Sequence, residues 1–103
     1  MTPTLVFDIE TVPDCAGLRR LHAIDPGVSD KDVAEFAFQR RRASHNTDFL
    51  PLHLHRVVAI SCAMREGDGF RVWSLGSPQD SERVLIQRFF DGIDKYTPTL
   101  VSW

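Results

Sequence analysis

Two acidic residues interrupt an apolar stretch near the N-terminus and constrain how that stretch folds. Residues 5–12 read Leu-Val-Phe-Asp-Ile-Glu-Thr-Val, which is rich in the β-branched and aromatic residues that favour strands. Side chains on a strand alternate between its two faces, so Asp8 and Glu10 are expected on the same face. Their Cα atoms would then lie about 6.6–6.8 Å apart, at a rise of about 3.3–3.4 Å per residue. The opposite face would hold the apolar side chains Leu5, Phe7 and Ile9.

Two carboxylates at this spacing, flanked by valines, repel each other and lose part of their hydration. A bound divalent cation would relieve both effects, and Mg²⁺ binds proteins through one or two carboxylates together with substrate phosphates. The alternative is a half-exposed strand whose solvent face holds two acids, since Asp-x-Glu is a short pattern. Asp is depleted in strands, however, so the pair needs a cause beyond strand formation.

The wider sequence around the pair resembles a known motif. Phe7-Asp8-Ile9-Glu10-Thr11 is similar to the first motif of the DEDD-type 3′–5′ exonucleases, in the family related to the proofreading exonuclease domain of family-B DNA polymerases. Residues 51–61 resemble the second strand of that family, residues 72–76 its third strand, and residues 89–93 the helix that follows. Residues 99–103 resemble the strand that leads into the second motif, an Asn followed by a Phe-Asp pair. Because the second and third motifs are absent here, the chain is expected to be the N-terminal part of such a domain.

The resemblance implies a 3′–5′ exonuclease, a hydrolase that cleaves nucleic-acid phosphodiester bonds with two metal ions, Mg²⁺ or Mn²⁺. It implies that Asp8 and Glu10 are catalytic metal ligands and that Ile9 and Thr11 bind substrate. The implied substrate is a single-stranded 3′ end, with DNA favoured over RNA. Residues 1–103 are expected to be inactive alone, because they supply one acidic pair. The alternatives are a noncatalytic module that binds nucleic acid or protein on the same fold, and a chain that assembles with a polypeptide carrying the missing motifs.

Composition excludes few classes of function. Charged residues make up 25% of the chain and the formal net charge is −2, so any contact with nucleic acid must be local. No apolar run approaches the ~18 residues of a membrane span, and the N-terminus shows no signal-peptide core. Cys15 and Cys62 lack metal-type spacing, which indicates a reduced, cytoplasmic chain.

A helical insertion is predicted over residues 15–50, after a first strand at about residues 4–12. A short helix is expected over residues 16–23. Ser29, followed by two acids in the next three residues, marks the start of a second helix that continues to about Ala43.

Downstream of the insertion, the pattern predicts a hairpin, a helix and a last strand. Strands at residues 57–64 and 70–75 flank a Gly-Asp-Gly turn. Ser77 is expected to cap the next helix, whose apolar residues recur at helical spacing, and residues 100–103 form the last strand. The periodicities indicate an α/β domain. With the resemblance they predict the N-terminal part of a ribonuclease-H-like fold, in which a three-stranded antiparallel meander is followed by a helix and a parallel strand, as a single partial domain over residues 1–103.

Histidines and tryptophans provide weaker candidates. His53 and His55 have the spacing of neighbours on one strand face, but a zinc site would need further ligands. We expect His55 to cap or pack at the start of the second strand, and contact with a substrate phosphate is the alternative. Trp73 and Trp103 lie on predicted strands and are expected to pack rather than to stack on bases.

Basic and aromatic residues of the insertion have two interpretations. Arg40-Arg41-Arg42 ends a predicted helix, where cations complement the helix dipole. The alternative is phosphate contact with single-stranded nucleic acid, supported by Arg19 and Arg20. Phe36 and Phe38 would stack on bases in that case, although at least one of them is expected in the core.

An incomplete layered α/β domain also leaves a strand edge and apolar sheet surface uncovered. Leu100, Val101 and Trp103 would lie at that boundary, as would the apolar strand from Val57. We therefore expect self-association, by edge pairing or by exchange of the terminal strand.

Overall fold

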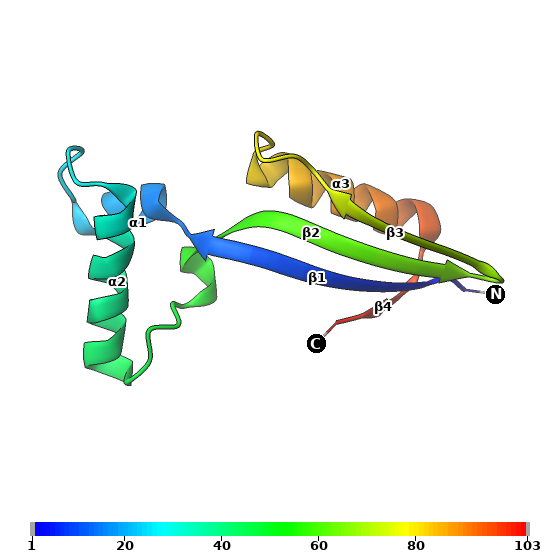
Figure 1. The fold of residues 1–103 in the computed structure, drawn as a ribbon, viewed down its shortest axis with the longest axis horizontal. Coiled ribbons are helices and arrows are strands. Elements are labelled where there is room, and N and C mark those ends of the chain that lie inside the picture. The colour runs from blue at the N-terminus through cyan, green and yellow to red at the C-terminus, as the bar shows by residue number, and fades with distance from the viewer. Residues whose placement is uncertain (1, 103) are drawn as a thin grey trace. The chain divides into compact units, whose positions relative to one another are not determined.

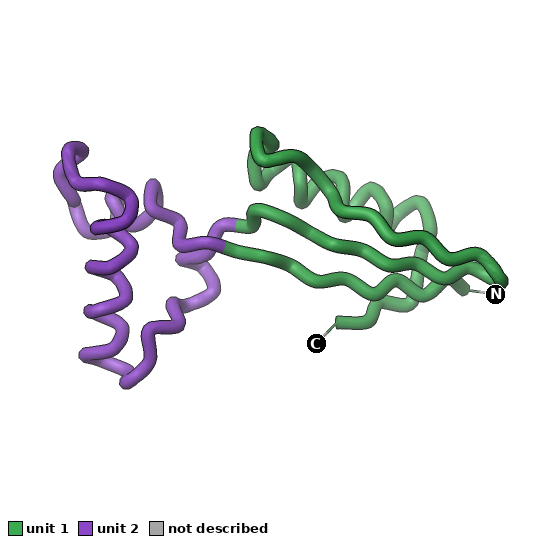
Figure 2. The backbone as a smooth tube through the Cα atoms, viewed as in Figure 1, with its two compact units in different colours: residues 1–11, 57–103 green, residues 12–56 purple. Residues whose placement is uncertain are grey.

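The computed structural model describes residues 2–102, which form two compact units (Figure 2). The sheet unit comprises residues 1–11 and 57–103, and the helical unit comprises residues 12–56. The helical unit contains the insertion expected over residues 15–50. None of the helices described within residues 2–102 is long and apolar enough to cross a membrane.

The described residues contain a mixed four-stranded sheet and three α-helices, the α/β architecture that the periodicities predict (Figure 1). The strands are β1 (Thr4–Pro13), β2 (His55–Glu66), β3 (Gly69–Leu75) and β4 (Thr99–Val101). Their order in the sheet is β3-β2-β1-β4, and β2 runs opposite to both of its neighbours (Figure 1). The β4 strand is parallel to β1, and their register pairs Leu5 with Leu100 and Val6 with Val101.

The hairpin of β2 and β3 closes where the sequence predicts it. Glu66 pairs with Gly69, so the loop is the two-residue turn Gly67-Asp68. Gly67 has a φ of 59°, a conformation that glycine adopts without steric cost. The last strand ends at Val101 rather than continuing as predicted, and Trp103 lies outside the described residues.

The α3 helix (Glu82–Tyr96) provides the apolar side chains that pack on the sheet. Five buried residues form this core: Leu5, Ile60, Cys62, Met64 and Leu85. The Phe7 ring lies 5.0 Å from the Phe89 ring, and Trp73 packs against the same core, as expected. Leu5 and Phe7 therefore occupy the predicted apolar face of β1, whereas Ile9 is 42% exposed.

Ser77 does not cap α3, contrary to the prediction. Ser77 and Asp80 close a turn instead, because the Ser77 amide donates to Asp80 Oδ2 at 2.9 Å and the Asp80 amide donates to the Ser77 carbonyl at 3.0 Å. Ser81 is the cap, and its Oγ accepts from the Val84 amide at 3.3 Å. The sequence offers two serines four residues apart, and the turn takes the first.

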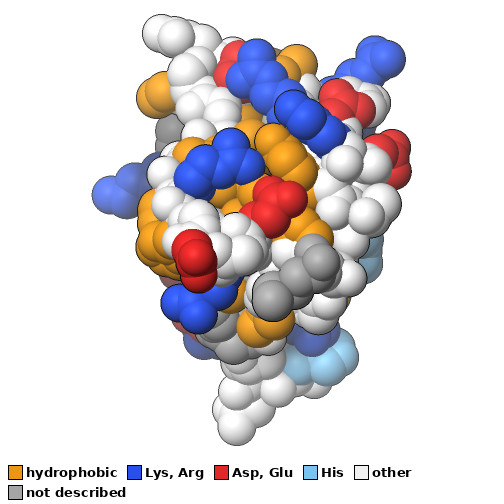
Figure 3. Space-filling model, turned by 90° about the vertical axis from the view of Figure 1, so that its right-hand side faces the viewer, with side chains coloured by type: hydrophobic (Ala, Val, Ile, Leu, Met, Phe, Trp, Pro, Cys, Tyr) orange, Lys and Arg blue, Asp and Glu red, His pale blue; other side chains and the backbone are white. Residues whose placement is uncertain are grey.

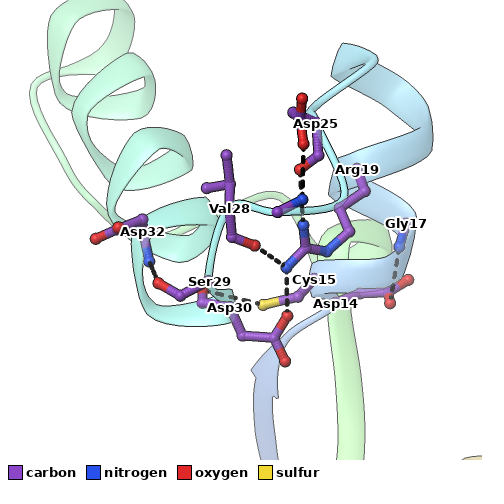
Figure 4. Close-up of polar contacts among 10 residues, drawn as sticks. Asp14, Cys15, Gly17, Arg19, Asp25, Val28, Ser29, Asp30 and Asp32 are labelled. Atoms are coloured by element: carbon purple, nitrogen blue, oxygen red, sulfur yellow. Dashed lines mark hydrogen bonds and ion pairs between the residues drawn. The ribbon is translucent and has the colours of Figure 1, made fainter.

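The helical unit contains α1 (Cys15–His22), α2 (Asp30–His45) and a 3₁₀ turn, η1 (Leu52–Leu54). Asp14 caps α1 by accepting from the Gly17 amide at 3.1 Å, and Ser29 caps α2 by accepting from the Asp32 amide at 3.2 Å (Figure 4). The Ser29 cap was predicted from the acids that follow it. Such caps satisfy amides that have no partner within the helix.

A separate apolar core holds the helical unit together. Its buried residues are Leu18, Val33, Ala37 and Leu50. Phe38 packs against this core, as expected for at least one of the two phenylalanines of α2. Phe36 is 39% exposed.

Candidate functional site

The acidic pair lies on β1, the strand between β2 and β4. Asp8 is half-buried and Glu10 is exposed. Strand alternation places both on the face opposite Leu5 and Phe7, which pack towards α3. Within residues 2–102, no basic side chain forms an ion pair with either carboxylate. Two acids therefore share one face of a central strand without a protein counter-charge in the described part of the chain.

The register of β4 directs that strand towards the acidic pair. Pairing between β1 and β4 ends at Val6 and Val101, two residues before Asp8. Because the strands are parallel, β4 runs in the same direction as the part of β1 that leads to Asp8 and Glu10.

Ile9 and Thr11 flank Glu10 in the exposed part of β1. By strand alternation, the side chains of Ile9 and Thr11 both lie on the face opposite Asp8 and Glu10. Their predicted role in substrate binding stays a prediction.

Strand geometry places the two acids on one face, and no third metal-ligating side chain lies close to them among the residues described. Across residues 2–102, no three His, Cys, Asp or Glu side chains gather closely enough to hold a metal ion. The pair thus provides carboxylate oxygens of the kind that Mg²⁺ and Mn²⁺ prefer. A complete two-metal centre would need donors beyond this pair.

The two histidines do not lie side by side on a strand, contrary to the expectation from their spacing. His53 is in η1 and is exposed, whereas His55 is the first residue of β2. The His55 Nε2 atom lies 2.9 Å from the Leu50 carbonyl oxygen, and its ring lies 5.1 Å from the Phe49 ring. His55 therefore packs at the start of β2, as predicted. A short 3₁₀ turn before the strand breaks the two-residue alternation that a pair of ligands would need.

Arg19 has a structural role in the loop between α1 and α2. Its Nη2 atom donates to the Val28 carbonyl at 2.6 Å and to Asp30 Oδ1 at 2.8 Å, while its Nη1 atom donates to the Asp25 carbonyl at 3.3 Å (Figure 4). These bonds occupy the guanidinium, so Arg19 does not support the alternative interpretation, in which the basic residues of the insertion contact phosphate. Arg20 is exposed.

Both cysteines are free thiols. Burial is the largest cause of the raised pKa of Cys15, followed by the nearby Asp30 carboxylate. The Cys15 thiol donates to the Asp30 carbonyl at 3.5 Å (Figure 4). Burial also raises the pKa of Cys62. Raised values favour the protonated thiol, whereas metal binding and nucleophilic attack need the thiolate.

The arginine run at the end of α2 divides between two environments. Arg42 forms ion pairs, whereas Arg40 and Arg41 line a cavity that also contacts His22. Sequence reasoning missed His22. The available signal was its position as the last residue of α1, in the same last turn as Arg19 and Arg20.

Charges of both signs are mixed elsewhere on the surface. The face in Figure 3 shows Lys and Arg side chains beside Asp and Glu, with exposed hydrophobic side chains among them. This mixture agrees with the net charge of −2 and with the inference that nucleic-acid contact must be local.

The comparison with known families settles the resemblance. A family model described as a predicted 3′–5′ exonuclease related to the exonuclease domain of PolB matches residues 47–103. The chain belongs to this family. The matched segment contains β2, β3, α3 and β4, and Asp8 and Glu10 precede it. Neither the curated proteins nor the solved structures include a significant match.

Membership makes the chain an exonuclease-related domain, of the nuclease and hydrolase kind, with nucleic acid as the kind of substrate. The mixed sheet and its packed helix are consistent with an exonuclease-like fold.

Proposed function

We propose that this chain carries the first acidic pair of a 3′–5′ exonuclease with a ribonuclease-H-like fold and a two-metal mechanism. The observation that carries the proposal is the placement of Asp8 and Glu10 on one face of a central strand, without a protein counter-charge within residues 2–102. Family membership supports phosphodiester hydrolysis among the reactions that such a pair allows.

The donor set fits a hard divalent cation. Asp8 and Glu10 offer only oxygen ligands, and the thiols have raised pKa values that disfavour the thiolate. Asp8 and Glu10 would hold Mg²⁺ or Mn²⁺, which when bound supplies an activated water and stabilises the leaving 3′ oxygen.

The contribution of this chain is to position groups. Pairing of β1 with β2 and β4 fixes the backbone on which the two carboxylates stand. Ile9 and Thr11, in the exposed part of the same strand, would contact the terminal nucleotide of a single-stranded 3′ end, with DNA favoured. The direction of β4 supports the proposal, because a strand continuing in this register would bring further side chains beside the pair.

The test is digestion of end-labelled single-stranded DNA and RNA in Mg²⁺ or Mn²⁺. Residues 1–103 alone should show no degradation above background, because two-metal hydrolysis needs more carboxylates than this pair. A longer chain that supplies the second and third motifs should degrade the 3′ end, and Asp8→Asn or Glu10→Gln should abolish that activity. Asp68→Asn, in the exposed turn between β2 and β3, is the charge-matched control and should keep it.

Full activity of either site variant, degradation from the 5′ end, or turnover by residues 1–103 alone would overturn the mechanism. An inactive longer chain that still binds single strands would instead favour a noncatalytic nucleic-acid-binding module.

A further inference from the structure

A cavity of about 460 Å³ lies within the helical unit, lined by residues of α1, of α2 and of the segment that leads into β2. Most of its lining is apolar and includes Leu18, Leu21, Ala37, Leu50, Pro51 and Leu54. His22, Arg40 and Arg41 provide its basic groups, and no Asp or Glu is among its lining residues. The cavity therefore combines an apolar wall with positive charge.

The three adjacent arginines differ in their partners. The Arg42 guanidinium lies 3.1 Å from Glu35 and 3.5 Å from Asp48, so two carboxylates compensate its charge. The Arg41 Nε atom donates to the Phe49 carbonyl at 3.0 Å, which orients the guanidinium without neutralising it. Within residues 2–102, neither Arg40 nor Arg41 forms an ion pair. The uncompensated positive charge of this run thus lies on the two arginines that line the cavity.

Aromatic rings adjoin these arginines. The Arg40 guanidinium lies 5.7 Å from the centre of the Phe36 ring, and the same ring makes an edge contact with His22 at 5.3 Å. Phe49, whose carbonyl holds Arg41, is 62% exposed. Exposed aromatic rings and guanidinium planes are the surfaces on which unpaired bases stack.

We propose that this cavity binds one nucleotide of a single-stranded nucleic acid, with its phosphate between Arg40 and Arg41 and its base against the apolar wall. The volume falls within the range of about 300–1,000 Å³ that small-ligand sites occupy. This inference rests on the proposed function, because a nuclease substrate is the polyanion that carries both phosphates and bases. A peptide made of Asp and Glu would use the charge and leave the apolar wall without a matching group.

Fluorescence anisotropy of the 103-residue chain with labelled oligothymidylate of 15 nucleotides, in EDTA, tests the inference without any metal. Each neutralised phosphate contributes about 0.7 to the slope of log affinity against log salt for single strands, so Arg40→Gln/Arg41→Gln, which removes both contacts to one phosphate, should lower the slope by about 0.7. Across a fourfold change in salt, that difference corresponds to about a 2.6-fold change in affinity. The double variant should also weaken binding at least about tenfold at low salt.

Arg42→Gln is the matched control, because it removes the same charge from the same helix turn at an ion-paired residue. It should change the affinity less than about twofold.

Leu21→Glu provides a second test, because Leu21 lines the cavity and is 61% exposed. The change places an acid in the cavity without removing a core side chain, and it should weaken binding as the double variant does. Circular dichroism of each variant checks that it folds, and Leu21→Glu provides the test if the double variant does not.

Asp68→Asn, in the exposed turn between β2 and β3, should leave this binding unchanged. Because the assay measures binding in EDTA without turnover, failure of this inference and failure of the nuclease mechanism are separate results. Equal losses in Arg42→Gln and in single Arg40→Gln or Arg41→Gln would overturn the inference. It would also fail if an abasic oligonucleotide, an acidic peptide or anionic vesicles competed as well as oligothymidylate.

Discussion

The acidic pair of β1 should cost stability when no cation is bound. Asp8→Asn and Glu10→Gln each remove one charge and keep the shape of the side chain. Because Glu10 is exposed and Asp8 only half-buried, a water-like dielectric constant applies. At about 6.7 Å, the spacing of alternate Cα atoms on a strand, two unit charges repel by about 0.6 kcal/mol. Either variant should therefore raise the free energy of unfolding by up to about 0.6 kcal/mol at pH 7 and low salt, which is about 2–5 °C in Tm.

Thermal unfolding followed by circular dichroism measures this gain at low salt and in 1 M NaCl. The Debye length falls to about 3 Å at 1 M, so the gain should disappear there. Mg²⁺ should reverse the order of the proteins, because only the wild type keeps both carboxylates. An ion present at about three times its own Kd adds about 0.8 kcal/mol, which exceeds the repulsion of up to about 0.6 kcal/mol. Asp68→Asn controls for net charge and should show neither effect.

The reasoning fails if Asp8→Asn lowers Tm at low salt, because the carboxylate would then be stabilising the fold. An equal gain in 1 M NaCl would assign the effect to something other than charge repulsion.

Three further expectations concern the metal, the surface and the core. Calorimetry should show weak binding of Mg²⁺ or Mn²⁺ to residues 1–103, since two carboxylates leave most coordination positions to water; tight zinc binding lost on changing His53 and His55 would contradict this. Sedimentation should show self-association at high concentration through the exposed apolar side chains of β3 and the edge strand β4, and a strictly monomeric profile would count against it. Gly76→Ala should lower the free energy of unfolding by about 2–4 kcal/mol in urea titrations, because Gly76 has a φ of 81° and its Cβ would overlap the buried Leu85 side chain. Combining it with Leu85→Ala should cost less than the sum of the two changes, and strict additivity would refute that contact.

The strands could be predicted because their signals are local. The apolar run from Val57 and the turn at Gly67-Asp68 define β2 and β3 to within a few residues. The start of α3 could not be predicted, because Ser77 and Ser81 have similar capping chemistry. The difference lies in a turn that the Asp80 side chain closes.

Strand alternation predicts which face each side chain of the acidic pair occupies, but not how exposed that side chain is. It places Asp8 and Glu10 on one face of a strand, and it correctly assigns Leu5 and Phe7 to the core. It does not report exposure along that face, since Asp8 is half-buried whereas Glu10 is exposed. Exposure depends on how far the neighbouring strands extend, which is a property of the assembled sheet.

The arginine run of α2 needed the structure for a physical reason. Consecutive residues on a helix point about 100° apart, so three identical neighbours do not all face the same surroundings. Arg42 meets Glu35, seven residues earlier on the same helix, and Asp48 beyond its end. Arg40 and Arg41 meet residues of α1 and of the segment before β2, whose positions follow from the packing of Leu18 against Val33 and Leu50. Ion pairs therefore compensate the charge of one member of the run, and phosphate binding is a property open to the other two.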